Sequence, residues 1–245
     1  MYGSWIILLI ILISSFPIIA VYIWFRIAKY QLKLIRFLLA LLSGAAAFIP
    51  ALVLQNFLII PSLTQGRLAL LYEFFVRIAL TEEISRLLMI SIFYLVSNLI
   101  IKRNSVKQEE SSAESLTFNT FKKGSAIGLA AGLGFALLES ARFTLSSMDT
   151  GILLLRVFYA FPLHAACGSR VGAAAVMFRT HPSQAILRII TATAIHGVYN
   201  FMLELPFGIP TIAAILIALS AFITAVINIR GVQFDAEEQK ETPEE

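Results

Sequence analysis

The chain has 245 residues, of which 58% are hydrophobic and 14% are charged, and its mean hydropathy is +0.84. Soluble domains carry about 25% charged residues, so the composition excludes an ordinary water-soluble fold and indicates a protein that has the lipid bilayer as its solvent. The formal net charge is +4, but the basic residues lie at the ends of apolar runs. This placement is typical of membrane topology and argues against a nucleic-acid partner.

Seven apolar runs predict an all-α, polytopic membrane helix bundle of about seven transmembrane helices. They lie near residues 4–25, 37–60, 68–101, 124–145, 152–178, 184–205 and 211–229. We expect one transmembrane domain over residues 1–230, followed by an acidic tail over 231–245. The polar segment 102–123 reads as a solvated loop.

The basic residues alternate between connections, which predicts how the bundle is oriented. They occur in the first, third and fifth connections and just after the last run, at Arg26, Lys29, Lys33, Arg36, Lys102, Arg103, Lys107, Lys122, Lys123, Arg179 and Arg230. Lys and Arg collect on the cytosolic side. We therefore expect an extracytosolic N-terminus, a cytosolic C-terminus and a multi-pass protein of the cell membrane.

Several runs contain ionisable side chains, which cost several kcal/mol in lipid unless they are paired or hydrated. The third run has Glu82, Glu83 and Arg86, the fourth Glu139 and Arg142, the fifth His164 and Arg170, and the sixth His196 and Asn200. With a rise of about 1.5 Å per residue, Glu83, Glu139, His164 and His196 fall at similar depths. Unrelated polar residues would scatter in depth, so the convergence predicts one shared, water-accessible cavity.

Spacing along each helix predicts the local pairs. Arg86 can reach Glu82 or Glu83, and Glu139 can reach Arg142. His196 and Asn200 share a helix face, which suits two donors to a developing oxyanion. Each group alone also has a purely structural interpretation, as an ion pair or a histidine bonded to a backbone carbonyl. We interpret the charged residues nearer the outer ends, Glu73, Arg77, Asp149 and Arg156, as rim charges.

The ordered set of motifs resembles PrsW-type membrane proteases, a group related to the CAAX-prenyl endopeptidases and bacteriocin-processing glutamate proteases. The motifs are Glu82-Glu83-x-x-Arg86, Gly134-Phe135-x-x-x-Glu139, His164 and His196-x-x-x-Asn200, within a core over residues 68–205. The sequence has Arg86 where such proteins often have Lys, and Ser140 where Asn is common. The Ser140 change removes an amide and leaves no expected orienting role for that position.

The resemblance implies an endopeptidase, without cofactor, that cuts a membrane-anchored protein in a prokaryotic membrane, and it suggests the first cut of an anti-sigma factor in stress signalling. It implies that Glu82 or Glu83 acts with His164 to activate a water, with Glu82 favoured as the base. His196 and Asn200 would stabilise the oxyanion, while Arg86 and Glu139 orient the base.

Three other interpretations remain open. A zinc-dependent protease would use His164, His196 and a glutamate, although no H-E-x-x-H motif is present. A proton-coupled transporter would use the same buried groups, and an inactive scaffold would merely retain the fold.

Overall fold

The computed structural model describes residues 2–28, 30, 32–59, 66–104, 113–206 and 208–230, with the side chains of 2–4, 97–104 and 113–119 left out. Its elements are listed here in chain order: α1 (Tyr2–Ile27), α2 (Leu34–Phe57), α3 (Arg67–Leu71), the π-helix η1 (Tyr72–Leu80), α4 (Thr81–Asn104), α5 (Ala113–Ser147), α6 (Thr150–Met177), α7 (Pro182–Glu204) and α8 (Ile209–Ile229). The described residues contain helices and no strand, as the hydropathy pattern predicts.

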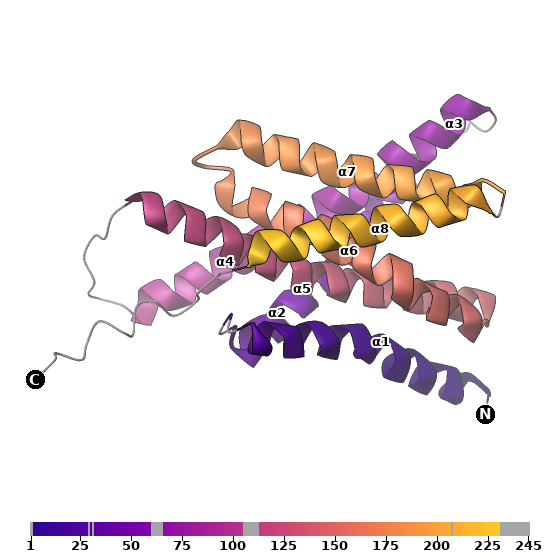
Figure 1. Ribbon diagram of the computed structural model, residues 1–245, viewed down its shortest axis with the longest axis horizontal. Coiled ribbons are helices and arrows are strands. Elements are labelled where there is room, and N and C mark those ends of the chain that lie inside the picture. The colour runs from indigo at the N-terminus through magenta and orange to yellow at the C-terminus, as the bar shows by residue number, and fades with distance from the viewer. Residues whose placement is uncertain are drawn as a thin grey trace, which may run out of the picture.

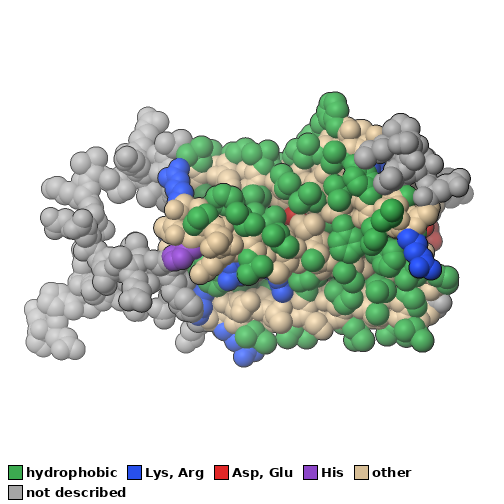
Figure 2. Space-filling model, turned by 90° about the horizontal axis from the view of Figure 1, so that it is seen from above, with side chains coloured by type: hydrophobic (Ala, Val, Ile, Leu, Met, Phe, Trp, Pro, Cys, Tyr) green, Lys and Arg blue, Asp and Glu red, His purple; other side chains and the backbone are tan. Residues whose placement is uncertain are grey.

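The long helices run back and forth along one axis (Figure 1). Within the described residues, six helices are long and apolar enough to cross a membrane: α1, α2, α5, α6, α7 and α8. The predicted third span is the continuous run of α3, η1 and α4, in which ionisable residues from Glu73 to Arg86 interrupt the apolar sequence. Figure 2 shows many hydrophobic side chains spread over the face in view, as a lipid-facing surface requires.

Two predicted boundaries change. The polar segment 102–123 is not all loop, because α4 continues to Asn104 and α5 already begins at Ala113; helical residues extend beyond the apolar run. The acidic tail over 231–245 lies outside the described residues.

The described basic side chains lie at one end of the bundle, where α1 meets α2, where α6 meets α7 and where α8 ends. They are Arg26, Lys33, Arg179 and Arg230. The orientation across the membrane stays a prediction.

Glycines let α5 and α6 pack with their backbones nearly in contact. A Cβ at Gly128 would lie 2.1 Å from the carbonyl oxygen of Gly168, and a Cβ at Gly132 would lie 2.0 Å from that of His164. Every other residue type has a Cβ, so the close approach requires glycine at these positions. The four-residue glycine spacing is therefore a packing seam, and it brings α5 directly against the turn of α6 that carries His164.

Gly168→Ala should lower the free energy of unfolding by about 1–3 kcal/mol, because its new methyl group would lie 2.3 Å from the carbonyl oxygen of Gly128. The matched control is Gly151→Ala on the same helix, where the nearest atom is the movable Asp149 carboxylate. Thermal unfolding in one detergent measures both. Equal melting temperatures for the two variants would contradict the packing seam.

Candidate active site

A wide helical turn leads into the paired glutamates. The π-helix η1 ends at Leu80, and α4 begins with Thr81, Glu82 and Glu83. The Thr81 hydroxyl donates to the carbonyl oxygens of Arg77 and Ile78, at 2.7 and 2.9 Å. These bonds satisfy two carbonyl oxygens where the π-helix changes to an α-helix. Short π-helical segments are often found at functional sites. Both carboxylates therefore emerge inside the bundle, with Glu82 3% and Glu83 0% exposed.

Glu83 holds the histidine of α7. Its Oε1 atom accepts from Arg86 Nη2 at 2.6 Å and from His196 Nδ1 at 2.8 Å. A carboxylate paired with an arginine can only accept, so Nδ1 of His196 carries the proton. In the tautomer with that proton, the Nε2 atom is an acceptor; it has no hydrogen bond to a described residue and lies 3.6 Å from Glu82 Oε2.

Glu139 holds the histidine of α6 in the same way. Its Oε2 atom accepts from His164 Nε2 at 2.7 Å and also pairs with Arg156. The proton therefore sits on Nε2, and the Nδ1 atom of His164 is buried without a hydrogen-bond partner among the described residues. Each histidine is thus held by one carboxylate, and each carboxylate is paired with one arginine.

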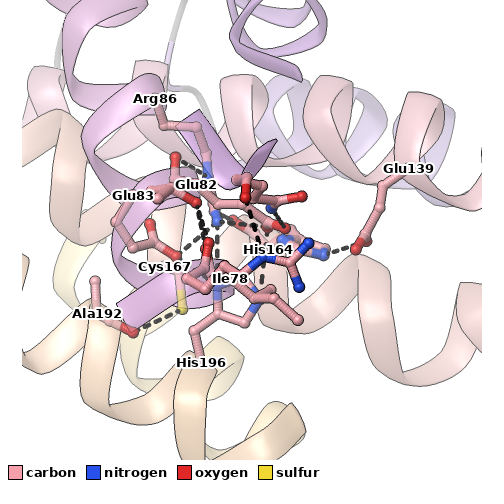
Figure 3. Close-up of polar contacts among 12 residues, drawn as sticks. Ile78, Glu82, Glu83, Arg86, Glu139, His164, Cys167, Ala192 and His196 are labelled. Carbon is pink, nitrogen blue, oxygen red and sulfur yellow. Dashed lines mark hydrogen bonds and ion pairs between the residues drawn. The ribbon is translucent and has the colours of Figure 1, made fainter. Parts of the chain in front are cut away.

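Glu82 is held more loosely than the other two carboxylates, since Arg86 Nη2 lies 3.8 Å from its Oε2 atom. Its Oε1 atom accepts from Gln55 Nε2 at 3.1 Å, whereas its Oε2 atom is buried and has no hydrogen bond to the described residues. One possible metal-ligand atom from each of Glu82, His164 and His196 lies within 4.8 Å of the other two. Figure 3 shows these side chains converging from α4, α6 and α7, with Glu139 beside them.

Arg86 joins the two halves of the site. Its Nε and Nη1 atoms donate to the carbonyl oxygens of Glu82 and His164, at 3.4 and 3.3 Å. Its guanidinium carbon lies 4.7 Å from the ring centre of Phe135, and the His164 ring packs against that phenylalanine at 5.3 Å. The fully buried arginine therefore neutralises Glu83 and fixes the position of α6 against α4.

The structure brings six of the seven predicted site residues together: Glu82, Glu83, Arg86, Glu139, His164 and His196. Asn200, one turn from His196, is half-buried and makes no hydrogen bond with the described residues. The pairing of His196 and Asn200 as oxyanion donors fits less well, because the only proton of a neutral His196 ring is engaged by Glu83. A donor role for Asn200 stays a prediction.

Two sequence-based interpretations are wrong. Arg142 does not pair with Glu139 but is exposed on the outside of α5. Arg156, interpreted from the sequence as a rim charge, pairs with Glu139 instead. Its Nε atom also donates to the Ser140 hydroxyl at 3.0 Å. Ser140, where an amide was expected, therefore accepts a hydrogen bond from the same arginine that pairs with Glu139. The i, i+3 rule considers one helix, whereas this pair crosses from α5 to α6.

The sequence also gave no reason to select Gln55 of α2, which touches Glu82. Its backbone carbonyl accepts from Arg77 Nε at 3.0 Å, and Arg77 in turn pairs with Glu73. These two charges, interpreted as surface charges, therefore fix the end of α2 that carries Gln55. Only the polar character of Gln55 within an apolar run was available as a signal.

A model of the PrsW family of intramembrane metalloproteases matches residues 34–227. The match covers most of the chain and includes every site residue, so the protein belongs to this family and is a multi-pass membrane protease. Among curated proteins and solved structures, none matches the chain.

Glu139→Gln and Arg156→Gln should be strongly coupled, because each single variant leaves a buried charge without its partner. We expect the double variant to be more stable than the sum of the single losses, by roughly 0.5–3 kcal/mol. Thermal unfolding of the three variants gives the coupling. As a control, Glu139→Gln combined with Arg142→Gln should be additive; coupling there instead would restore the Arg142 pair.

Proposed function

We propose that the protein hydrolyses a peptide bond of a membrane-anchored protein at the triangle formed by Glu82, His164 and His196. The observation that carries this proposal is the convergence of three hydrogen-bond acceptors, inside the bundle, for which the described residues provide no hydrogen-bond donor. Glu82 Oε2 and His164 Nδ1 are buried without a hydrogen bond to any described residue, and His196 Nε2 lies 3.6 Å from Glu82 Oε2. Such an arrangement suits the capture and activation of a water molecule.

The surrounding charges prepare this triangle. Glu83 and Glu139 hold the two imidazole rings in fixed tautomers, so that one unprotonated nitrogen of each is available. Arg86 and Arg156 stabilise these two carboxylates in the charged form. The positions of the ligand atoms support Glu82 as the catalytic carboxylate, because Glu82 and not Glu83 has an oxygen within 4.8 Å of a nitrogen of both His164 and His196.

In the metal-free form of the proposal, Glu82 Oε2 takes a proton from the water as the oxygen attacks the scissile carbonyl, and it returns this proton to the amine nitrogen as the C–N bond breaks. His164 Nδ1 accepts the second hydrogen of that water and fixes its direction. Gln55 holds the other oxygen of Glu82, so the free oxygen faces the histidines. This is glutamate-type peptide hydrolysis, in which proton transfer by a placed carboxylate contributes roughly 10²- to 10⁴-fold to the rate.

A second chemistry at the same residues is favoured by the number of acceptors. A single water donates two hydrogen bonds and cannot satisfy three acceptors, whereas a divalent cation can. One oxygen and two neutral imidazole nitrogens form a His₂Glu donor set suited to Zn²⁺, and both rings have the carboxylate support that ligating histidines usually have. A metal ion held there would supply Lewis-acid activation of the water and of the scissile carbonyl.

The family's description as metalloproteases supports the same reading. The absence of H-E-x-x-H does not oppose it, because the two histidines reach the triangle from different helices, α6 and α7. With a metal ion bound, Glu82, His164 and His196 would be its ligands, and Glu83 and Glu139 would orient His196 and His164.

The proposed substrate follows from the depth of His164 and His196 in the membrane. His164 lies 13 residues from Met177 and His196 lies 14 residues from Pro182, so both are about 20 Å from the helix ends that carry the basic residues. With those ends cytosolic, the cut falls in the outer half of the bilayer. A single-span anti-sigma factor cut near its extracytosolic side fits this height.

Glu82→Gln, His164→Ala and His196→Ala should each lower cleavage of a coexpressed single-span substrate by roughly 10²-fold or more. The substrate set should include a membrane-bound anti-sigma factor, and cleavage is read by immunoblot at matched protein levels. The controls are Glu204→Gln and His181→Ala, the same residue types at exposed positions. Full cleavage by Glu82→Gln or His164→Ala would remove the triangle from the mechanism.

Elemental analysis of purified protein separates the two chemistries. With a metal centre we expect about one divalent ion per chain, its loss from Glu82→Gln and His164→Ala, and activity that a chelator removes and the metal restores. His181→Ala should keep the ion. Metal-free protein that cleaves at full rate in the presence of chelator would contradict the metal centre and leave Glu82 as the base.

A further inference from the structure

The last turn of α2 is held in part by side chains of the π-helix η1. The final carbonyl oxygens of a helix have no N–H partner within that helix. The carbonyl oxygen of Gln55 accepts from Arg77 Nε at 3.0 Å, and that of Leu58, the residue after the helix, accepts from the Tyr72 hydroxyl at 3.0 Å. Two residues of η1 therefore cap the end of α2.

Arg77 is well placed for this cap. Its Nη1 atom pairs with Glu73, four residues earlier, and its own carbonyl oxygen accepts from the Thr81 hydroxyl at 2.7 Å. The guanidinium is therefore held by an ion pair through Nη1 while Nε donates to α2. Its positive charge also lies at the carboxyl end of α2, where the helix dipole favours a cation.

The capped turn carries the one side chain that, within the described part of the chain, donates a hydrogen bond to the Glu82 carboxylate. Gln55 Nε2 donates to Glu82 Oε1 at 3.1 Å, whereas Glu82 Oε2 has no hydrogen bond to a described residue. A glutamate side chain has several rotatable bonds, so a contact is needed to fix the place of its carboxylate. The backbone oxygen and the side-chain amide of Gln55 thus connect Arg77 to Glu82.

Another face of η1 lies against α7 beside His196. Phe75 packs on Gly197, where a Cβ would lie 2.5 Å from the phenyl ring. The π-helix therefore contacts both the turn of α2 that holds Glu82 and the turn of α7 that carries His196. Because Glu82 Oε2 and His196 Nε2 are 3.6 Å apart, a small shift of either turn changes the geometry of the triangle.

We propose that Arg77 is a positioning residue for the reaction at Glu82, acting through the end of α2 and the Gln55 amide. Without Arg77, the last turn of α2 loses its cap and frays. The amide then no longer holds Glu82 Oε1, and Oε2 loses its fixed place beside the two histidines. This role rests on the proposed function, and it makes the rate depend on a partly exposed arginine outside the triangle.

A double-mutant cycle in the cleavage rate tests the proposal. Arg77→Leu removes the donors, and Gln55→Met removes the amide but keeps the backbone carbonyl. With a purified single-span protein that the wild type cuts in coexpression, each single variant should lower kcat roughly tenfold or more and leave KM little changed. Because both act through one contact, the double variant should be no slower than Gln55→Met. Losses that multiply would overturn the action of Arg77 through Gln55.

Two comparisons separate positioning from a loss of fold. Arg67→Gln, at an exposed arginine of α3, should keep the wild-type kcat, and Arg77→Lys, which keeps a charged donor, should recover part of the rate lost in Arg77→Leu. Hydrogen exchange read by mass spectrometry should be faster at the end of α2 in Arg77→Leu but not in Arg67→Gln. Unchanged exchange in Arg77→Leu would overturn the cap.

Failure of the proposed function gives a different result. Equal cleavage by the wild type and Glu82→Gln would remove the reaction from Glu82, and the role of Arg77 with it. Full cleavage by Arg77→Leu, together with its loss in Glu82→Gln, would contradict the role of Arg77 alone.

Discussion

The architecture depends on the requirement that no charge stay unpaired inside the bundle. Glu83 and Glu139 each bind one arginine and one histidine through a single oxygen atom. The two groups come from α4 with α7, and from α5 with α6, so satisfying the charges also fixes the helices. Removing any one member leaves the others exposed to a medium that cannot solvate them. Stability and chemistry therefore use the same contacts.

This requirement explains why part of the site could be read from the sequence. Glu82, Glu83, Arg86, His164 and His196 stand out because such residues are costly in apolar helices, and similar depth is enough to predict that they meet. The helix count and the glycine seam follow from equally local patterns. The assignment of partners does not, since Glu139 could bond to Arg142 on its own helix or to Arg156 across the α5–α6 turn, and only packing decides between them.

The remaining gaps have similar causes. The π-helix at Tyr72–Leu80 leaves no mark in a hydropathy pattern, although it determines which way Glu82 and Glu83 point. Gln55 is one polar residue in an apolar run, and its contact with Glu82 depends on how α2 lies against α4. The possible metal-ligand set has no single-helix motif in the sequence, because tertiary packing collects its donors from the three helices α4, α6 and α7.

The triangle is also closed, since His164 and His196 are each 1% exposed. Glu82 is 3% exposed, so the proposed hydrolysis at this triangle requires the surrounding helices to part before a polypeptide can reach it. Substrate selection then depends partly on how long a membrane segment stays next to the protease. A segment is cut only when it is still beside the bundle as the helices part. A protease of this kind can remain among abundant membrane proteins without destroying them, because the groups proposed to react are buried in the closed arrangement.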